Sequence, residues 1–411
     1  MRITIPNNFF HQFLFTLCVA VTYLNIFELT IFIWTLTALI SLSNKYSVSF
    51  LKLNLPFLII LLTAFIVMLT KDYENYFIIR DITYLIKPIV GFFIGYQLYK
   101  KNMNNAFNLI LNTALFIAII HIIVVVIAFI FQNARTLNDI RLYGGYFSDY
   151  EVYALIILIF YKNFDIDFST KKAKVYTILV AISFVLYFAR TNFIQFVILY
   201  LAIKGYFTIT RKSLTIIFSI ILTTLICYST ILYINPKRNG DGVEAFLYKI
   251  KIAPLEPFKT KINREDYIDF NDNYRSFENI MTIRQVSRDG YWNVIFGKGL
   301  GSQIDLKQKV YLGDMELRFI SILHNGFMIV FLKSGLFGIF VYFYSIYYFF
   351  KKRSNKLKIQ KNINLLFLGT GVFLFLSNWV FLGFYNLIDT KTIFLGFLIA
   401  YSEKIKNEIQ E

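Results

Sequence analysis

Residues 106–131 read AFNLILNTALFIAIIHIIVVVIAFIF, a run of 26 residues without a charged side chain. An α-helix needs only about 20 apolar residues to cross the hydrocarbon core of a bilayer. The whole 411-residue chain has this character, because 57% of its residues are hydrophobic and only 16% are charged. A soluble protein is roughly one quarter charged and could not cover its surface with so few charges. The composition excludes a soluble enzyme, a disordered regulator and a disulfide scaffold, and it predicts an all-α polytopic membrane protein.

Similar apolar runs recur along the chain and predict about 12 membrane-spanning helices. The expected spans are 9–26, 28–43, 55–70, 83–99, 106–131, 148–161, 174–190, 191–208, 213–234, 336–350, 363–384 and 388–402. When alternate connections are assigned to opposite sides, nearly all of the net charge of +17 falls on one side. An excess of Lys and Arg marks the cytoplasmic side. Both termini are therefore predicted to be cytoplasmic, and the basic charge is a topological signal that does not point to nucleic acid.

The connection 235–335 predicts an extracytoplasmic subdomain. Its first part, 235–317, is nearly neutral and too long to lack structure of its own, so we expect a mostly helical loop. The segment 319–333 is apolar enough to span, but a span there would move the basic residues 351–361 to the outer side. We therefore expect a re-entrant or interface-lying helix at 319–333. The predicted organisation is nine spans in 1–234, this loop in 235–335, and three spans with a cytoplasmic tail in 336–411.

Ionisable residues near the outer surface of the membrane are the first candidates for a functional site. A charged side chain within a membrane costs free energy, so it is often retained for a function. Arg190 is expected at a tight outer turn, and Lys87 is expected to snorkel from within a span. His324 has polar neighbours and can act as a base near pH 7, whereas His121 is expected to pack inside an apolar helix. The outer candidates are Arg80, Arg141, Arg190, Arg284, Arg288, Glu316, Arg318 and His324.

Three acidic pairs of the pattern Asp-x-Glu are also expected to face outward. They are Asp72/Glu74, Asp149/Glu151 and Asp314/Glu316. Such pairs can hold a divalent cation against a diphosphate. No second group of ligands accompanies them, so solvated surface charges are the preferred interpretation and we expect no metal.

Several arginines around a membrane-level cavity suit an anionic ligand, because guanidinium groups bind phosphate oxygens in bidentate fashion. A polyprenyl diphosphate glycolipid fits this arrangement, with its tail among Phe-rich helices and its sugars outside. A sugar hydroxyl would attack the anomeric carbon while His324 or Glu316 accepts the proton. Arginines would stabilise the leaving diphosphate, so no metal and no other cofactor is needed. Direct attack would invert the anomeric centre.

Four short motifs resemble those of the bacterial O-antigen polymerase and O-antigen ligase superfamily of integral-membrane glycosyltransferases. They are Arg141-Leu142-Tyr143-Gly144, Ala189-Arg190-Thr191, Arg284 with Trp292 and Gly297-Lys298-Gly299, and His324-Asn325 followed by Gly335-Leu336-Phe337-Gly338. The resemblance covers about residues 55–402 and implies a GT-C-like fold in a bacterial inner membrane. It implies that Arg190, Arg284 and His324 are catalytic, while Arg288 is a rival of Arg284 because the spacing to the glycine turn is short. Ala189 and Asp149 depart from the usual Ser and neutral amide of the family.

The resemblance implies a polymerase of lipid-linked repeat units of O-antigen or capsular polysaccharide. A ligase that transfers finished glycan remains an alternative, since nothing in the sequence separates the two. A glycolipid transporter or flippase is less favoured, because the chain shows no internal repeat. The implied partners are a polyprenyl-diphosphate-linked oligosaccharide, the lipid bilayer and a chain-length regulator protein. Substrate binding is assigned to Arg80, Arg141, Arg288, Glu316 and Arg318.

Overall fold

The computed structural model describes residues 8–43, 45–101, 105–208, 210–239, 243–312, 315–351, 353, 356–386 and 388–408. The first half is helical throughout. Its helices are α1 (Phe9–Ala20), the 3-10 turn Val21–Leu24, α2 (Phe27–Ile40), α3 (Val48–Met68), α4 (Asn75–Lys100), α5 (Ala106–Phe131), α6 (Leu137–Gly144), α7 (Asp149–Ile159), α8 (Thr170–Leu186), α9 (Arg190–Ile203) and α10 (Arg211–Ile234).

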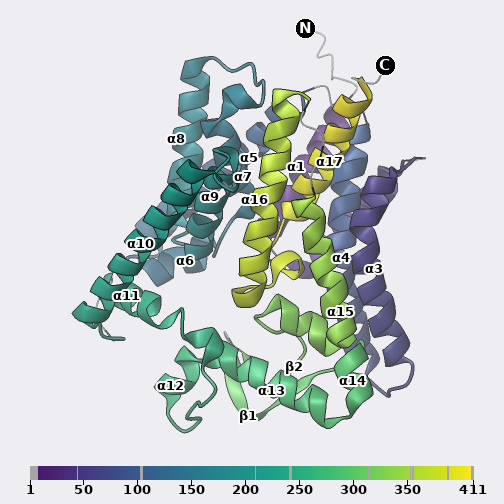
Figure 1. Ribbon diagram of the computed structural model, residues 1–411, viewed down its shortest axis with the longest axis vertical. Helices are drawn as coiled ribbons and strands as arrows, with labels where there is room; N and C mark the ends of the chain where they lie inside the picture. The colour runs from purple at the N-terminus through teal and green to yellow at the C-terminus, as the bar shows by residue number, and fades with distance from the viewer. Residues whose placement is uncertain are drawn as a thin grey trace.

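The second half begins with a subdomain of shorter elements and returns to long helices. We call it the outer subdomain after the side of the membrane on which the sequence predicts it. The outer elements are α11 (Val243–Ile252), the 3-10 turn Glu256–Phe258, α12 (Tyr267–Asp272), α13 (Tyr274–Arg288), α14 (Tyr291–Phe296), β1 (Ile304–Leu312) and β2 (Met315–Ile320). The long helices are α15 (Gly326–Phe350), α16 (Lys358–Val380) and α17 (Lys391–Glu408). Figure 1 shows α12–α14 and the hairpin gathered at one end of the long helices, while α17 ends at the other.

Five helices of the described chain, α3, α5, α10, α15 and α16, are long and apolar enough to cross a membrane. Shorter apolar helices cover Phe9–Leu24, Phe27–Ile40 and Arg190–Ile203. These findings support the expected all-α membrane protein. Each of the expected spans falls on a helix, while the number of crossings stays a prediction.

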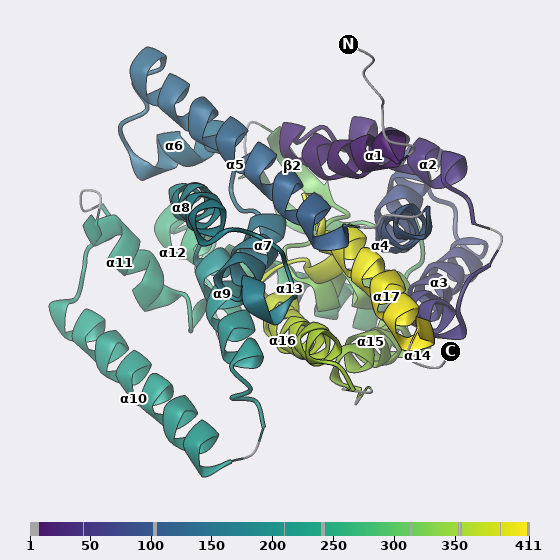
Figure 2. The same ribbon diagram turned by 90° about the horizontal axis from the view of Figure 1, so that it is seen from above.

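The helices expose apolar side chains on their outer surface. Ile123 and Phe131 of α5 are exposed, and the apolar part of α10 has no buried residue. Figure 2 shows α10 at the edge of the molecule, where its main contacts are with α11. Such a surface would be unstable in water but suits the hydrocarbon of a bilayer.

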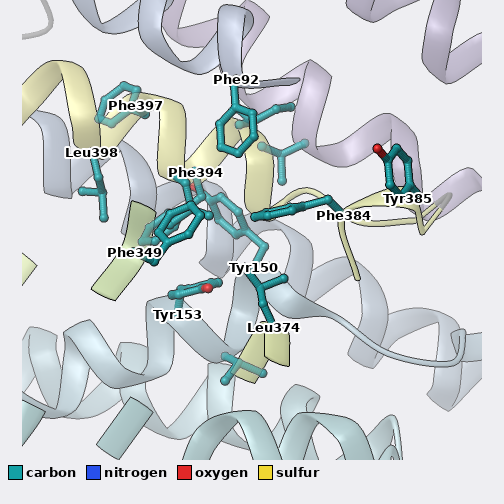
Figure 3. Close-up of a cluster of buried hydrophobic side chains, with 14 of the residues drawn as sticks. Phe92, Tyr150, Tyr153, Phe349, Leu374, Phe384, Tyr385, Phe394, Phe397 and Leu398 are labelled. Carbon is teal, nitrogen blue, oxygen red and sulfur yellow. The ribbon is translucent and has the colours of Figure 1, made fainter. Parts of the chain in front are cut away.

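The interior is built around α4 and α17, which lie side by side at the centre of the helices (Figure 2). A side chain at Gly95 or Gly396 would collide with the backbone of the opposite helix, so only glycine permits this close approach. Aromatic rings fill the adjacent space, and Figure 3 shows Phe92, Tyr153, Phe384 and Phe394 within it. The rings of Tyr153 and Phe394 stack with centroids 4.4 Å apart.

The outer subdomain differs from the prediction in two respects. It contains an antiparallel hairpin, β1 with β2, which the sequence analysis did not predict. The expected helix at 319–333 is also wrong at its start, because Phe319 and Ile320 end β2 and the helix begins only at Gly326. It continues past a kink at Gly335, where φ is 66°, into the expected span 336–350. Residues 326–335 are all buried within the protein.

The segment 297–301 docks the outer subdomain onto the long helices. Gly297, Gly299 and Gly301 all have positive φ, which glycine adopts without strain. A Cβ atom on Gly297 would lie 2.5 Å from the backbone nitrogen of Ser334, beside the kink of α15. The Lys298 amide donates to the carbonyl of Leu332 at 2.7 Å, and the Leu300 amide donates to that of Ala64 at 3.1 Å. The segment therefore binds both α15 and α3 through its backbone.

A buried ion pair secures the same junction. The ammonium group of Lys333 in α15 donates to the Asp81 carboxylate of α4 and, at 2.6 Å, to the Ser302 carbonyl. The Gly301 amide donates to Asp81 at 2.7 Å. Both charged side chains are 2% exposed, so loss of one partner would leave an uncompensated charge in the interior.

Lys333→Met should lower the free energy of unfolding by about 3–5 kcal/mol, because it leaves Asp81 buried without its cation. Lys333→Met combined with Asp81→Asn should cost less, since no charge is then stranded. Thermal and denaturant unfolding of the purified protein in detergent measures both effects. Lys71→Met, at an exposed lysine, serves as the control, and equal stability of the Lys333 and Lys71 variants would contradict the role of this pair.

Candidate functional site

His324 lies in the loop between β2 and α15. The next residue, Asn325, caps α15, because its Oδ1 accepts from the amides of Phe327 at 2.9 Å and Met328 at 3.2 Å. Asn325 also donates from its side chain to the Trp379 carbonyl of α16 at 3.0 Å. The cap fixes the backbone beside His324 and explains the Asn-Gly sequence at the helix start.

The imidazole of His324 is held by Glu278 of α13. Its Nδ1 lies 3.0 Å from both carboxylate oxygens of Glu278, and its backbone amide donates to Oε2 at 3.1 Å. A carboxylate accepts hydrogen bonds, so this contact favours the tautomer with the hydrogen on Nδ1 and leaves the Nε2 lone pair directed away from Glu278. The Glu278 side chain is 1% exposed and that of His324 is 46% exposed. The arrangement fixes the orientation of the imidazole and leaves part of it exposed.

A cluster of cations surrounds this side of α13. Its members come from four elements, because Arg141 lies in α6, Arg190 begins α9, Lys249 lies in α11 and Arg275 lies in α13. The Arg190 guanidinium donates to the backbone carbonyl of Lys249 at 3.0 Å. Arg190 also interacts electrostatically with Arg275 and Arg141. We call these four residues the cation cluster.

One carboxylate, Glu256, lies within the cation cluster. It pairs with Arg275 at 3.2 Å and interacts electrostatically with Arg190 and His324. Burial raises the pKa of Glu256, although Arg275 and Arg190 oppose this effect. Glu256 therefore connects the cation cluster to His324 while leaving an excess of positive charge.

The cations of the cluster repel one another and are partly buried. Burial lowers the pKa of Lys249, and the positive charges of Arg141 and Arg190 lower it further. Burial also lowers the pKa of Arg141. The buried Nε atoms of Arg141 and Arg275 donate no hydrogen bond within the described chain. A bound phosphate would relieve the repulsion between these cations and accept hydrogen bonds from their free donors.

A network of buried ions lies beside the cation cluster. Lys391 of α17 lies 3.0 Å from Asp149 and 2.9 Å from Asp389, and Lys87 donates to the backbone carbonyl of Asp389 at 3.1 Å. A small cavity joins Lys391 and Asp149 to Thr191, the residue after Arg190. The expected snorkelling of Lys87 is wrong, because the side chain is 1% exposed and its ammonium group has acceptors inside the protein.

The structure contradicts one prediction about buried residues and agrees with another. The expected outward direction of Asp149 and Glu151 is wrong, since both are buried and Glu151 accepts from Ser183 at 2.6 Å. His121 packs as expected, with its Nδ1 2.7 Å from the Ser183 hydroxyl and its ring stacked on Tyr187. Asp314 lies outside the described residues. Among the described residues, no group of three or more His, Cys, Asp or Glu side chains is placed to hold a metal ion.

Arg190 interacts electrostatically with Arg141 and with Glu256, and Glu256 in turn interacts with His324, whereas Arg284 lies elsewhere. Arg284 lines a separate pocket of about 470 Å³ with Arg264 and Phe277. Phe277 and Arg284 lie seven residues apart on one face of α13, which differs from the face of Glu278. Arg284 therefore takes no part in the contacts described for Arg190 and His324, and its predicted catalytic role stays a prediction.

The remaining candidates also lie apart from the cation cluster. Arg288 is exposed at the end of α13. Arg318 pairs with Asp305 at 2.9 Å, and Glu316 pairs with Lys309 at 3.0 Å, both within the hairpin. The hydrogen bond from Arg318 holds the pKa of Asp305 below its usual range. Arg80 donates to the hydroxyl of Ser321, which lies three residues before His324 in the same loop. Its guanidinium group also covers the ring of Phe77.

Four residues of this site are not predicted from the sequence, namely Lys249, Glu256, Arg275 and Glu278. Arg275 and Glu278 are three residues apart and share a helix face, which is the one local signal they carry. The comparisons with known proteins add no further residue, because no family model, no curated protein and no solved structure matches this chain.

Binding of inorganic diphosphate to the purified protein tests which arginines form the anion site. Arg190→Ala and Arg275→Ala should each weaken binding about tenfold or more, since each removes a charge-assisted hydrogen-bond donor. Arg284→Ala, the matched control from the same helix as Arg275, should leave binding unchanged. Calorimetry in detergent measures the three variants, and a loss confined to Arg284→Ala would contradict the cation cluster as the anion site.

Proposed function

We propose that this protein is a polymerase of lipid-linked oligosaccharide repeat units, of the O-antigen or capsular polysaccharide type. It transfers glycan from a polyprenyl diphosphate to an acceptor sugar hydroxyl at the outer face of the bacterial inner membrane. The observation that carries the proposal is that Glu256, within the cation cluster, also interacts with the oriented His324. The motif resemblance supports the same chemistry independently of the geometry.

The cation cluster would hold the diphosphate. Arg141, Arg190 and Arg275 offer guanidinium donors from three different elements, and Lys249 adds a fourth charge. Their positive charge stabilises the diphosphate most strongly when it leaves, because its negative charge increases in the transition state. This preference for the transition state accelerates the reaction beyond what substrate binding alone achieves.

His324 would act as the general base. The acceptor hydroxyl gives its proton to Nε2, and its oxygen forms a bond with the anomeric carbon. The bond from that carbon to the diphosphate oxygen breaks, and the electron pair leaves with the lipid diphosphate. The Glu278 carboxylate stabilises the imidazolium through Nδ1, as its 3.0 Å separation allows. A single displacement of this kind inverts the anomeric configuration and uses no metal.

Deletion of the gene tests the proposed activity. The lipid-linked glycans of the deletion strain should accumulate as single repeat units on polyprenyl diphosphate, because transport continues while joining stops. Mass spectrometry of the extracted lipids measures the distribution. Long chains stranded on the lipid would instead show a ligase, and unchanged lipid-linked and surface glycans would contradict both transferase functions.

Complementation of the deletion strain tests the roles of His324 and Glu278. His324→Ala should reduce polymer formation by a factor of about 10² to 10⁴, the usual contribution of a general base. Glu278→Gln should reduce it less and displace its pH profile, because the neutral amide no longer stabilises the imidazolium. His11→Ala, in α1, is the control and should complement fully. Full activity of the His324 variant, with insertion confirmed by immunoblot, would contradict the base assignment.

A further inference from the structure

A second pocket lies at the opposite end of the long helices from the outer subdomain. It has a volume of about 480 Å³ and lies between the start of α3 and the ends of α4 and α17. Its polar lining includes Lys45, Ser47, Lys100, Glu403 and Lys404. All these residues belong to connections that the charge distribution predicts to be cytoplasmic. The pocket is therefore separate from the proposed glycan site.

Both carboxylate oxygens of Glu403 in this pocket accept hydrogen bonds from hydroxyl groups. Ser47 donates to Oε1, and the Tyr96 hydroxyl donates to Oε2 at 2.8 Å. The backbone amide of Ser47 donates in turn to the Tyr96 hydroxyl at 3.1 Å. The Tyr96 ring stacks on Phe50 with centroids 4.1 Å apart. The floor of the pocket is thus ordered by hydrogen bonds and aromatic packing.

The lysines retain unused hydrogen-bond donors. The Lys100 ammonium donates to the Lys45 carbonyl at 2.7 Å and lies 4.7 Å from the centre of the Tyr96 ring. It forms no ion pair within the described chain, and neither does Lys45. Lys404 has only an exposed contact of 3.8 Å with Glu408, which contributes little. Lys45 and Lys100 therefore line the pocket without an ion pair in the described chain, although the carboxylates of Glu403 and Glu408 line it as well.

An apolar surface adjoins the pocket. Val48, the residue after Ser47, begins a stripe of exposed side chains that continues through Leu51, Leu55, Leu58 and Leu62 along α3. These residues repeat every three or four positions and therefore lie on one face of the helix. A ligand with a phosphate in the pocket could lay an acyl chain along this stripe.

We propose that this pocket binds the phosphate group of an anionic phospholipid, with Lys45 and Lys100 as its principal ligands. Basic pockets between spanning helices on the cytoplasmic side are suited to acidic lipid headgroups. A soluble phosphate ester offers the same charge but lacks the acyl chains that match the stripe on α3. The lipid anchors α3, α4 and α17 to one another at this end of the molecule.

The test measures lipid retention by the purified full-length protein with native mass spectrometry. The lipids are phosphatidylglycerol and phosphatidylcholine, offered in equal amounts in mixed micelles. Phosphatidylglycerol should be retained preferentially, and Lys45→Gln with Lys100→Gln should reduce its retention roughly tenfold. The matched control is Lys171→Gln with Lys174→Gln, which removes two exposed lysines from the start of α8 and should leave retention unchanged.

A further arm separates a lipid from a soluble ligand. Glycerol phosphate, added at the concentration of the lipid, should neither displace phosphatidylglycerol nor raise the thermal unfolding temperature of the protein. Displacement by glycerol phosphate would overturn the lipid as the ligand. Equal loss in the pocket variant and the α8 control would show that surface charge alone attracts the lipid, and would overturn the site. Equal retention of the two lipids would overturn it as well.

Discussion

The backbone contact between the segment 297–301 and the kink of α15 is the constraint on which the site depends. Of its three glycines with positive φ, Gly297 lies against the kink at Gly335 and Gly299 lies against α3. The buried pair of Asp81 and Lys333 holds the same junction. α14 ends immediately before this segment, and α13 lies just before α14. The loop carrying His324 leads directly into α15. The junction therefore positions both Glu278 and His324 relative to the long helices.

The positive charge of the site follows from the elements that supply its residues. Arg190 is at the start of α9, and the outer helices α6, α11 and α13 supply the other cations. Bringing four cations together costs free energy, of which Glu256 offsets only a part. The adjacent ions of Lys391, Asp149 and Asp389 are paired among themselves, so they do not neutralise the cluster. A diphosphate would supply the missing negative charge, which is the physical reason for the function we propose.

The sequence predicts the helices well because apolar runs have few other structural solutions in a membrane. It also proposes Arg141, Arg190 and His324 as site residues, because their short motifs lie at helix boundaries. It fails for Arg275 and Glu278, because the outer loop contains many charges and only its folded arrangement selects among them. Arg284 was chosen from motif spacing, but the rotation of α13 places it in another pocket. Lys87 was misjudged because its partners, Asn386 and Asp389, are about 300 residues away.

The hairpin was missed for a different reason. β1 reads IDLKQKVYL, and its pairing with β2 is interrupted by an irregularity between Asp305 and Val310. Such an interruption disturbs the alternation of polar and apolar residues by which a strand is identified. The ion pairs of Arg318 with Asp305 and of Glu316 with Lys309 lie within the hairpin and stabilise it. These four residues do not belong to the cation cluster.

An experimental structure with bound polyprenyl diphosphate tests the central claim most directly, because it shows where the phosphates lie. The site described above predicts phosphate oxygens within hydrogen-bond distance of Arg190 and Arg275, with the Nε2 atom of His324 facing the outer side of the ligand. Phosphate density in the pocket of Arg264 and Arg284, away from His324, would contradict it.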